Sequence, residues 1–173
     1  MSRLIPRLGA LSLLLVLAAC DSTDDTGSFD VADYVGTYNG AATVRFDGPD
    51  GPVEQSTPLV VRVVAPAGGN TVTITLTPEG GEPIVFAGTH DADGAVFPVP
   101  GSTLVMRVDA DGDISGTGTL PLFDVTLRAT TSGRITPERL LITADVEVTE
   151  GTESTPAGTE GQVTFEALRV AGG

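Results

Sequence analysis

Three aspartates at alternate positions are the residues whose spacing best suits metal chemistry. Asp109, Asp111 and Asp113 follow the pattern in which calcium-binding loops place their first carboxylates. Such a loop also needs a glycine at its sixth position and a bidentate glutamate at its twelfth, but Ile114 and Leu120 stand there. Tight turns favour aspartate and glycine as well. We therefore expect a hairpin turn and no metal site, with these aspartates as the candidates if a metal does bind.

The only histidine, His90, is the candidate for general acid–base chemistry. It ends a predicted strand beside Asp91 and Asp93, has no cysteine partner, and the chain has no Gly-x-Ser-x-Gly elbow that would strain a serine nucleophile. Two tyrosines, six phenylalanines and no tryptophan leave little aromatic surface for sugar stacking. We therefore expect no catalytic residue, no cofactor and no enzyme activity, and we interpret His90 as a solvated turn residue.

The composition excludes several other classes of protein. Nine arginines and no lysine stand against 23 acidic residues, so the formal net charge is −14 and no basic face could neutralise nucleic-acid phosphates. One cysteine and one histidine exclude a disulfide framework and a clustered zinc site. The hydrophobic content of 40% is typical of a folded chain, and the length of 173 residues indicates one domain.

The first nineteen residues are typical of a signal peptide. Arg3 and Arg7 precede an apolar stretch at 8–17, which is too short to span a bilayer. Leu17-Ala18-Ala19-Cys20 resembles the bacterial lipobox, which implies cleavage before Cys20 and a diacylglycerol on its thiol. The resemblance implies a protein anchored to a membrane of the bacterial cell envelope through the lipid on Cys20. An ordinary secretory signal with a chance cysteine is the alternative.

Residues 20–30 are predicted to be the lipidated cysteine and a short acidic tether. Cleavage removes Arg3 and Arg7 and leaves seven arginines against 23 acidic residues, a formal charge of −16. Asp21 resembles the inner-membrane retention residue of enterobacterial lipoproteins, whereas the run 21–25 resembles the surface-export signal of Bacteroidetes lipoproteins. A merely solvated tether is the third interpretation, and we expect the outer membrane.

Apolar and polar side chains alternate with period two through residues 31–173, which predicts an all-β domain. A single helical turn is expected near 30–33, with Asp30 as its N-cap. Val72, Ile74 and Leu76 face one way in 71–77 and four threonines face the other. The same alternation predicts ten strands near 34–46, 58–64, 71–77, 83–89, 94–99, 103–109, 113–120, 123–130, 139–148 and 162–169. The other inward-facing sets include Leu59, Val61, Val63; Ile84, Phe86; Leu104, Met106, Val108; Ile114, Leu120; Phe123, Val125, Leu127; Leu140, Ile142, Val146; and Val163, Phe165.

Short connections rich in glycine, aspartate and asparagine join these strands, as in hairpins. No predicted helix is long enough to cross between parallel strands, so the sheet must be antiparallel throughout. We therefore expect an antiparallel up-and-down meander of about eight to ten strands closing into a barrel, because closure removes exposed strand edges. A β-sandwich is the alternative.

The segment from Tyr34 to Val44, Tyr-Val-Gly-Thr-Tyr-Asn-Gly-Ala-Ala-Thr-Val, resembles the opening strand of the lipocalin-like and calycin-like barrels of bacterial, particularly Bacteroidetes-type, lipoproteins. Gly36-x-Tyr38 stands where lipocalins place Gly-x-Trp. The family's last strand often carries an arginine that packs over this aromatic residue, which implies a barrel-closing pair of Tyr38 and Arg169. The resemblance also implies binding or transport of a small apolar ligand.

Small residues on the predicted inward faces bear on whether such a ligand has room. They either line a cavity at the barrel mouth or mark places where neighbouring backbones approach closely. We therefore expect a lipid-anchored envelope protein that binds a small apolar ligand in its barrel, with the membrane as its partner. The alternative is a structural or protein-interaction envelope domain with a filled barrel. The small residues are Gly36, Gly40, Ala42, Gly116 and Gly118.

Overall fold

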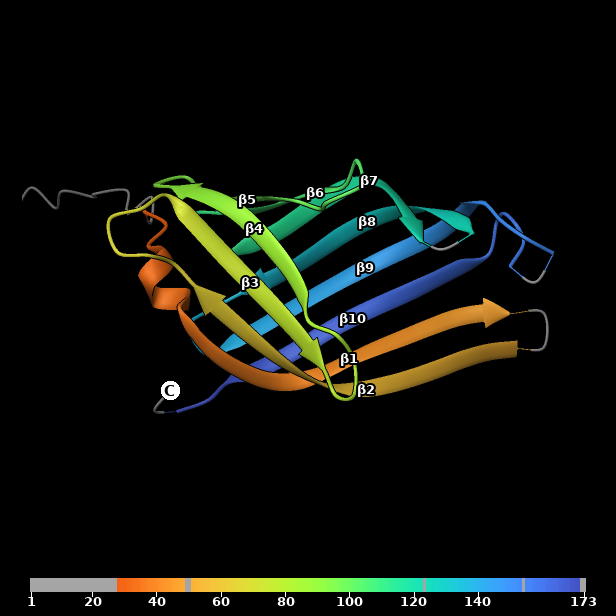
Figure 1. Ribbon diagram of the computed structural model, residues 1–173, viewed down its shortest axis with the longest axis horizontal. Coiled ribbons are helices and arrows are strands. Elements are labelled where there is room, and N and C mark those ends of the chain that lie inside the picture. Colours follow the sequence, from red (N-terminus) through yellow and green to blue (C-terminus); the bar gives the residue numbers. More distant parts are fainter. Residues whose placement is uncertain (1–27, 49–50, 123, 154, 172–173) are drawn as a thin grey trace, which may run out of the picture.

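Ten antiparallel strands close into one barrel in the computed structural model, which describes residues 28–48, 51–122, 124–153 and 155–171 (Figure 1). Each strand pairs with its neighbours in sequence, and β10 returns to β1 to complete the ring. The predicted up-and-down barrel is confirmed, and the sandwich alternative is wrong. The predicted signal peptide, Cys20 and most of the predicted tether lie outside the described residues.

The helical turn and the strands have the following bounds. They are η1 (Val31–Tyr34), β1 (Gly36–Gly48), β2 (Gly51–Val64), β3 (Thr71–Pro78), β4 (Ile84–Asp91), β5 (Gly94–Pro98), β6 (Val105–Asp109), β7 (Asp113–Leu122), β8 (Val125–Ile135), β9 (Arg139–Glu150) and β10 (Glu160–Arg169).

Alternation of side chains explains why these segments form strands with one buried face. In β2, Leu59, Val61 and Val63 are buried and the residues between them are exposed. The predicted strand at 58–64 is therefore confirmed, but β2 begins at Gly51, seven residues earlier than predicted. Its first half, Gly51–Thr57, lacks a regular apolar alternation and is held by pairing with β1.

Ile84 lies on the inner face in register with Leu76, as predicted, but it is 49% exposed and does not belong to the core. Ile84 opens β4 opposite Leu76 of β3, but β5 pairs with β4 only from Thr89 to Asp91. The start of β4 therefore has no described strand partner on its second side to cover the Ile84 side chain. The predicted inward residue Phe123 lies outside the described residues.

One end of the barrel is covered by η1 and the residues before it (Figure 1). Asp30 caps the turn by accepting a hydrogen bond from the amide of Ala32 at 2.9 Å, as predicted. The ring of Phe29 stacks on that of Tyr34 with centroids 5.0 Å apart, and the amide of Phe29 donates to the carbonyl of Ala92. The strand that follows η1 therefore enters the barrel from a closed end, which we call the η1 end.

The core is densest at this η1 end. The main cluster joins Phe29 of the covering segment to inward side chains of the strands, including Tyr38, Val61, Phe97 and Leu140. A second and smaller cluster, formed by Leu104, Ala129 and Val146, lies apart from it. Both clusters are built from the apolar faces that alternation predicts, and together they position everything described below.

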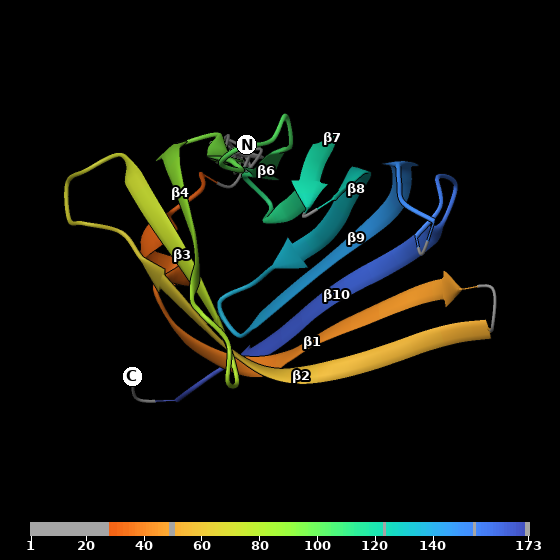
Figure 2. The ribbon, with the colours of Figure 1, turned by 45° about the vertical axis from the view of Figure 1, so that its right-hand side comes forward.

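At the opposite end the wall of the barrel is incomplete. Residues 51–57 of β2 pair with β1 but not with β3, because pairing between β2 and β3 begins at Leu59. β1, β2, β8, β9 and β10 continue there beyond β3 and β4 (Figure 2). We call this the open end, and it leaves part of the inner face of the long strands less buried than the core at the η1 end.

Candidate functional site

Tyr38 is the innermost polar residue of the η1 end. Its side chain is fully buried, and the strand register places it opposite Arg169 on one side and Val61 on the other. Its hydroxyl donates a hydrogen bond to the carbonyl of Tyr34 at 2.8 Å. This bond ties the end of η1 to β1, so Tyr38 holds the covering turn against the barrel.

Arg169 connects three chain segments at the same end. Its guanidinium donates to the carbonyls of Asp33 at 2.9 Å, Val35 at 2.6 Å and Pro137 at 3.2 Å. These carbonyls belong to η1, to the residue between η1 and β1, and to the turn between β8 and β9. A Cβ on Gly36 would lie 3.0 Å from the Arg169 Nε, so glycine leaves the space that the guanidinium occupies.

Burial decides the ionisation of the two tyrosines. Desolvation raises the pKa of Tyr38 above 10.0; the charge of Arg169 opposes this effect, and Glu138 and Tyr34 add to it. Desolvation also raises the pKa of Tyr34, with a further contribution from Asp33. Both phenols keep their protons at neutral pH, as any tyrosine does, and the raised pKa extends this protonated range, in which Tyr38 acts as a hydrogen-bond donor.

The small inward residues differ in how much space surrounds them. A Cβ on Gly40 would overlap the backbone of Glu166 and Ala167, and a Cβ on Gly118 would overlap the backbone of Leu104. These are places where neighbouring strands approach closely, so the missing side chains leave no room for a ligand there.

The other two small positions lie against side chains. A Cβ on Gly116 would lie 2.5 Å from Oγ1 of Thr131, a buried residue whose hydroxyl has no partner among the described residues. Ala42 is half-buried and packs against the main core cluster.

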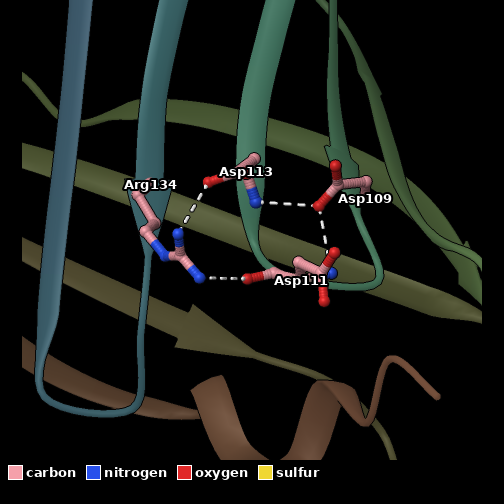
Figure 3. A network of polar contacts seen from close by, with 4 residues as sticks. All are labelled: Asp109, Asp111, Asp113 and Arg134. Atoms are coloured by element: carbon pink, nitrogen blue, oxygen red, sulfur yellow. Dashed lines mark hydrogen bonds and ion pairs between the residues drawn. The ribbon is translucent and has the colours of Figure 1, made fainter. Parts of the chain in front are cut away.

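The aspartate triplet forms a tight turn between β6 and β7 (Figure 3). The Asp109 carboxylate accepts hydrogen bonds from the amides of Asp111 at 3.0 Å and Asp113 at 2.9 Å. Arg134 pairs with the Asp113 carboxylate at 3.3 Å and donates to the Asp111 carbonyl at 3.3 Å. The Asp109 carboxylate therefore organises the turn, and the Asp113 carboxylate balances a cation.

His90 is less solvated than the sequence indicates. It lies in β4 opposite Ala95, and its Nε2 is buried without a hydrogen-bond partner among the described residues. The prediction of a solvated turn histidine is therefore wrong for this nitrogen. The reason is the inward register of β4: His90 shares a face with Phe86 and Gly88, and the loop before β3 covers it through its backbone bond to Asn70.

Two open hollows meet at His90. One, of about 530 Å³, extends along β4, β5 and β6 to Arg107 and Asp109. The other, of about 590 Å³, lies between the residues before η1 and the loop at Gly69. Asp91 lines both, but its carboxylate already accepts a hydrogen bond from the Asp93 amide at 2.9 Å. No group of three or more potential metal ligands is found in the described part of the chain.

The outer surface of the barrel is asymmetric in charge, a feature that the sequence reading missed. On β7 to β10 the outward residues form ion pairs: Arg128 with Glu147 at 3.2 Å and Arg139 with Glu166 at 2.7 Å. The outer side of β1 to β4 carries charges towards its margins, where Arg45 lies 3.8 Å from Asp47, and Glu54 and Asp91 also face outward. Between them lies a patch of outward residues in which Arg62 is the charged member, and Glu166 borders it opposite Ala41. The patch consists of Thr37, Asn39, Ala41, Pro58, Val60, Arg62, Val64, Thr71, Thr73, Thr75, Thr77, Val85, Ala87, Thr89 and Leu168.

Comparison with known proteins identifies a fold but no family. No protein-family model and no curated protein matches the chain. Among solved structures, the fold is similar to a protein of unknown function from the DUF3598 family of Nostoc punctiforme, with a TM-score of 0.52 and 14% identity. The match covers 83% of this chain and 50% of that one, so this chain spans half the length of its neighbour. At this identity the likeness shows the fold alone.

A membrane-spanning helix is not found in the described ranges, since none of their helices combines sufficient length with sufficient apolar character.

Proposed function

We propose that this protein is a lipid-anchored domain of the bacterial cell envelope that acts through its outer surface, as a structural or protein-interaction module with a filled barrel. The observation that carries the proposal is the packing of the η1 end. Large inward side chains from the strands meet Phe29 of the covering segment in one buried cluster. A barrel filled by its own side chains has no room there for a ligand.

The small residues support the same conclusion. The space where a side chain of Gly40 or Gly118 would lie is occupied by the backbone of neighbouring residues. At Gly116 the Thr131 side chain occupies that space. The two hollows at His90 are both open: one extends along β4, β5 and β6, and the other lies between the residues before η1 and the loop at Gly69.

The anchor is the second part of the proposal and rests on the lipobox at residues 17–20. Eight residue-to-residue steps separate Cys20 from Ser28, and a chain segment of that length spans about 15 Å on average if it behaves as a random coil. Because Ser28 leads directly into η1, such a tether would hold the η1 end near the bilayer. The Tyr38 and Arg169 contacts would then secure the end of the barrel on which the anchor pulls.

A small apolar ligand bound at the open end is the second candidate function, and it follows from the resemblance to lipocalin-like barrels. The observation in its favour is that Val44, Phe46 and Val163 lie on the inner face of the long strands but are only partly buried. Val53, near the β1–β2 tip, is 66% exposed. An elongated apolar molecule could cover these side chains.

Fractionation of cells tests the anchor. The full chain should sediment with membranes, Cys20→Ala should release it into the soluble fraction, and Ser22→Ala, a matched change in the same tether, should leave it bound. If Cys20→Ala stayed in the membrane fraction as Ser22→Ala does, lipidation at Cys20 would be contradicted.

Native mass spectrometry tests the interior. The detergent-solubilised full chain should show the mass of the acylated polypeptide without a further small molecule. A co-purifying apolar molecule that Ala144→Leu displaces, by filling the inner face at the open end, would overturn the filled barrel in favour of the second candidate.

A further inference from the structure

We propose that Pro52, Glu54 and Pro58 protect a free edge of β2 against pairing with a strand of another chain. The inference goes beyond the proposed function and does not depend on the anchor. It begins with the gap in the barrel wall at the open end, where residues 51–57 of β2 pair with β1 but β3 pairs with β2 only from Leu59 (Figure 2). One side of this segment therefore has no strand partner among the described residues.

One hydrogen bond identifies the backbone groups that face this free edge. The carbonyl of Pro58 accepts from the amide of Glu79 at 2.9 Å, so it points away from β1 and towards the side of β3. Successive residues of a paired strand direct their backbone groups to opposite sides, and the pairs between β1 and β2 run without a break. The backbone groups of residues 52, 54, 56 and 58 therefore face the edge, and those of 53, 55 and 57 face β1.

Two of these four edge-facing residues are prolines, at the two ends of the set. Proline has no amide hydrogen to donate, and its ring stands where a neighbouring strand would come into hydrogen-bonding range. The carbonyl of Pro58 is also already bonded to Glu79. A second strand would therefore find amide donors at Glu54 and Ser56 in place of four in a row.

Glu54 places a charge in the middle of what remains. Its side chain is exposed on the outer surface and forms no ion pair with a described residue, although it stands opposite Arg45 in register. If the edges of two copies met in antiparallel fashion, the two Glu54 carboxylates would lie near each other. Like charges on directly paired strands destabilise the pairing.

The surroundings of the edge explain why protection is needed there. Val53 is 66% exposed, and Val60, where β3 begins to cover β2, is 43% exposed. An uncovered strand edge beside exposed apolar side chains is a template for association between chains. The prolines and the glutamate occupy positions that face the edge, whereas Val53, Gln55 and Thr57 occupy those that face β1.

The free edge of β4 is shorter and needs less protection. The amide of His90 donates to the carbonyl of Asn70 before β3, so the odd-numbered residues of β4 face the side of β5. β5 pairs with β4 only from Thr89, which leaves Val85 and Ala87 facing the gap, and Pro83 precedes them. Very short edges are themselves a means by which proteins avoid edge pairing.

Amide hydrogen exchange in the detergent-solubilised full chain tests which groups face the edge. The amides of Glu54 and Ser56 should exchange at least about tenfold faster than those of Val53, Gln55 and Thr57, which are bonded to β1. Equal protection of the two sets would overturn the proposal, because it would mean that the edge is already paired or that the alternation is reversed.

Sedimentation velocity over a hundredfold range of protein concentration tests the protection itself. The parent should remain a single copy throughout. Pro52→Thr combined with Pro58→Thr restores two amide donors without a change of charge, and this double variant should associate within the range. Adding Glu54→Val should lower the concentration needed by a further factor of at least about ten, because the like charges are removed.

Pro66→Thr combined with Pro100→Thr is the matched control, since both prolines are exposed and lie outside the strands. It should remain a single copy. Double and triple variants that stay single, or a control that associates as readily, would overturn the proposal. If the double variant loses the circular dichroism of the parent, Glu54→Val alone takes its place: it should associate within the range, and a single copy would overturn the proposal.

Discussion

Gly40 provides the sharpest test of how the barrel interior is filled. The change is Gly40→Ala, which adds one methyl group to the inner face of β1. That methyl would overlap the carbonyl oxygen of Glu166 and would lie 2.5 Å from the Cα of Ala167, both on β10. Because these atoms belong to the backbone of a paired strand, they cannot rotate away as a flexible side chain could.

The expected magnitude follows from this overlap. Overpacking a filled core typically costs about 1–3 kcal/mol and occasionally more. Here the backbones of two paired strands must separate, so we expect a loss of at least about 3 kcal/mol in the free energy of unfolding. For a chain of this size that corresponds to a fall in Tm of about 6–12 °C. If Gly40 instead lined a cavity, alanine would gain about 0.5–1 kcal/mol over glycine within a strand.

Urea unfolding followed by circular dichroism measures the difference. Gly69→Ala is the control, because a Cβ there meets its nearest atom, the carbonyl oxygen of Pro66, at an ordinary 3.5 Å. Its effect should stay within about 0.5 kcal/mol. Gly118→Ala should resemble Gly40→Ala, since it overlaps the backbone of Leu104. Gly36→Ala should also destabilise the fold, because the added methyl would lie 3.0 Å from the Arg169 Nε and the backbone of Gly36 has a φ of 157° that side chains rarely adopt.

Equal midpoints for Gly40→Ala and Gly69→Ala, or a rise for Gly40→Ala, would refute the reasoning. The inner side of β1 would then be open, and the ligand-binding candidate would gain the support that the filled barrel loses.

Three further predictions concern the η1 end and the aspartate turn. Tyr38→Phe should cost about 1 kcal/mol through the lost bond to Tyr34. The pKa of Tyr38 is raised in the folded chain, so as pH rises through 10 the phenol of the unfolded chain ionises first and the folded state loses stability. Tyr38→Phe removes this phenol and should therefore lose less stability above pH 10 than the parent does. Arg169→Gln should cost about 1–3 kcal/mol and speed amide exchange in η1; exchange unchanged from the parent would contradict its bracing role. Asp109→Ala should cost about 1–2 kcal/mol and Asp111→Ala almost nothing in thermal melts. Millimolar calcium should leave the Tm of the parent and of both variants unchanged. A rise in the Tm of the parent with calcium would show a metal site.

The strands could be predicted because their signal is local. Alternation in 71–77 places Val72 and Leu76 in the core, and Asp30 caps the turn at η1 as its position indicated. Where alternation is weak the prediction fails, as in the first half of β2, which pairing with β1 alone maintains. The exposed Ile84 shows the same limit, since its burial depends on whether β5 reaches it.

The candidate site was less accessible to sequence reasoning. His90 was expected in solvent, yet its Nε2 is buried, because the face on which a histidine lies depends on the register of its strand. The aspartate turn could be interpreted correctly from its residue types, since aspartate and glycine satisfy turn geometry within a few residues of chain. The patch of weakly charged outward residues around Arg62 needed five strands to be aligned before it could be recognised.

The sequence by itself therefore determined which segments form strands, which side chains of most strands point inward, and which connections turn. Each of these depends on residues a few positions apart. Only the tertiary structure decided that Arg169 reaches η1, that the inner side of Gly40 is filled, and that the outward residues around Arg62 lie side by side. These depend on register between strands far apart in the chain, and a shift of one residue would exchange the inner and outer faces.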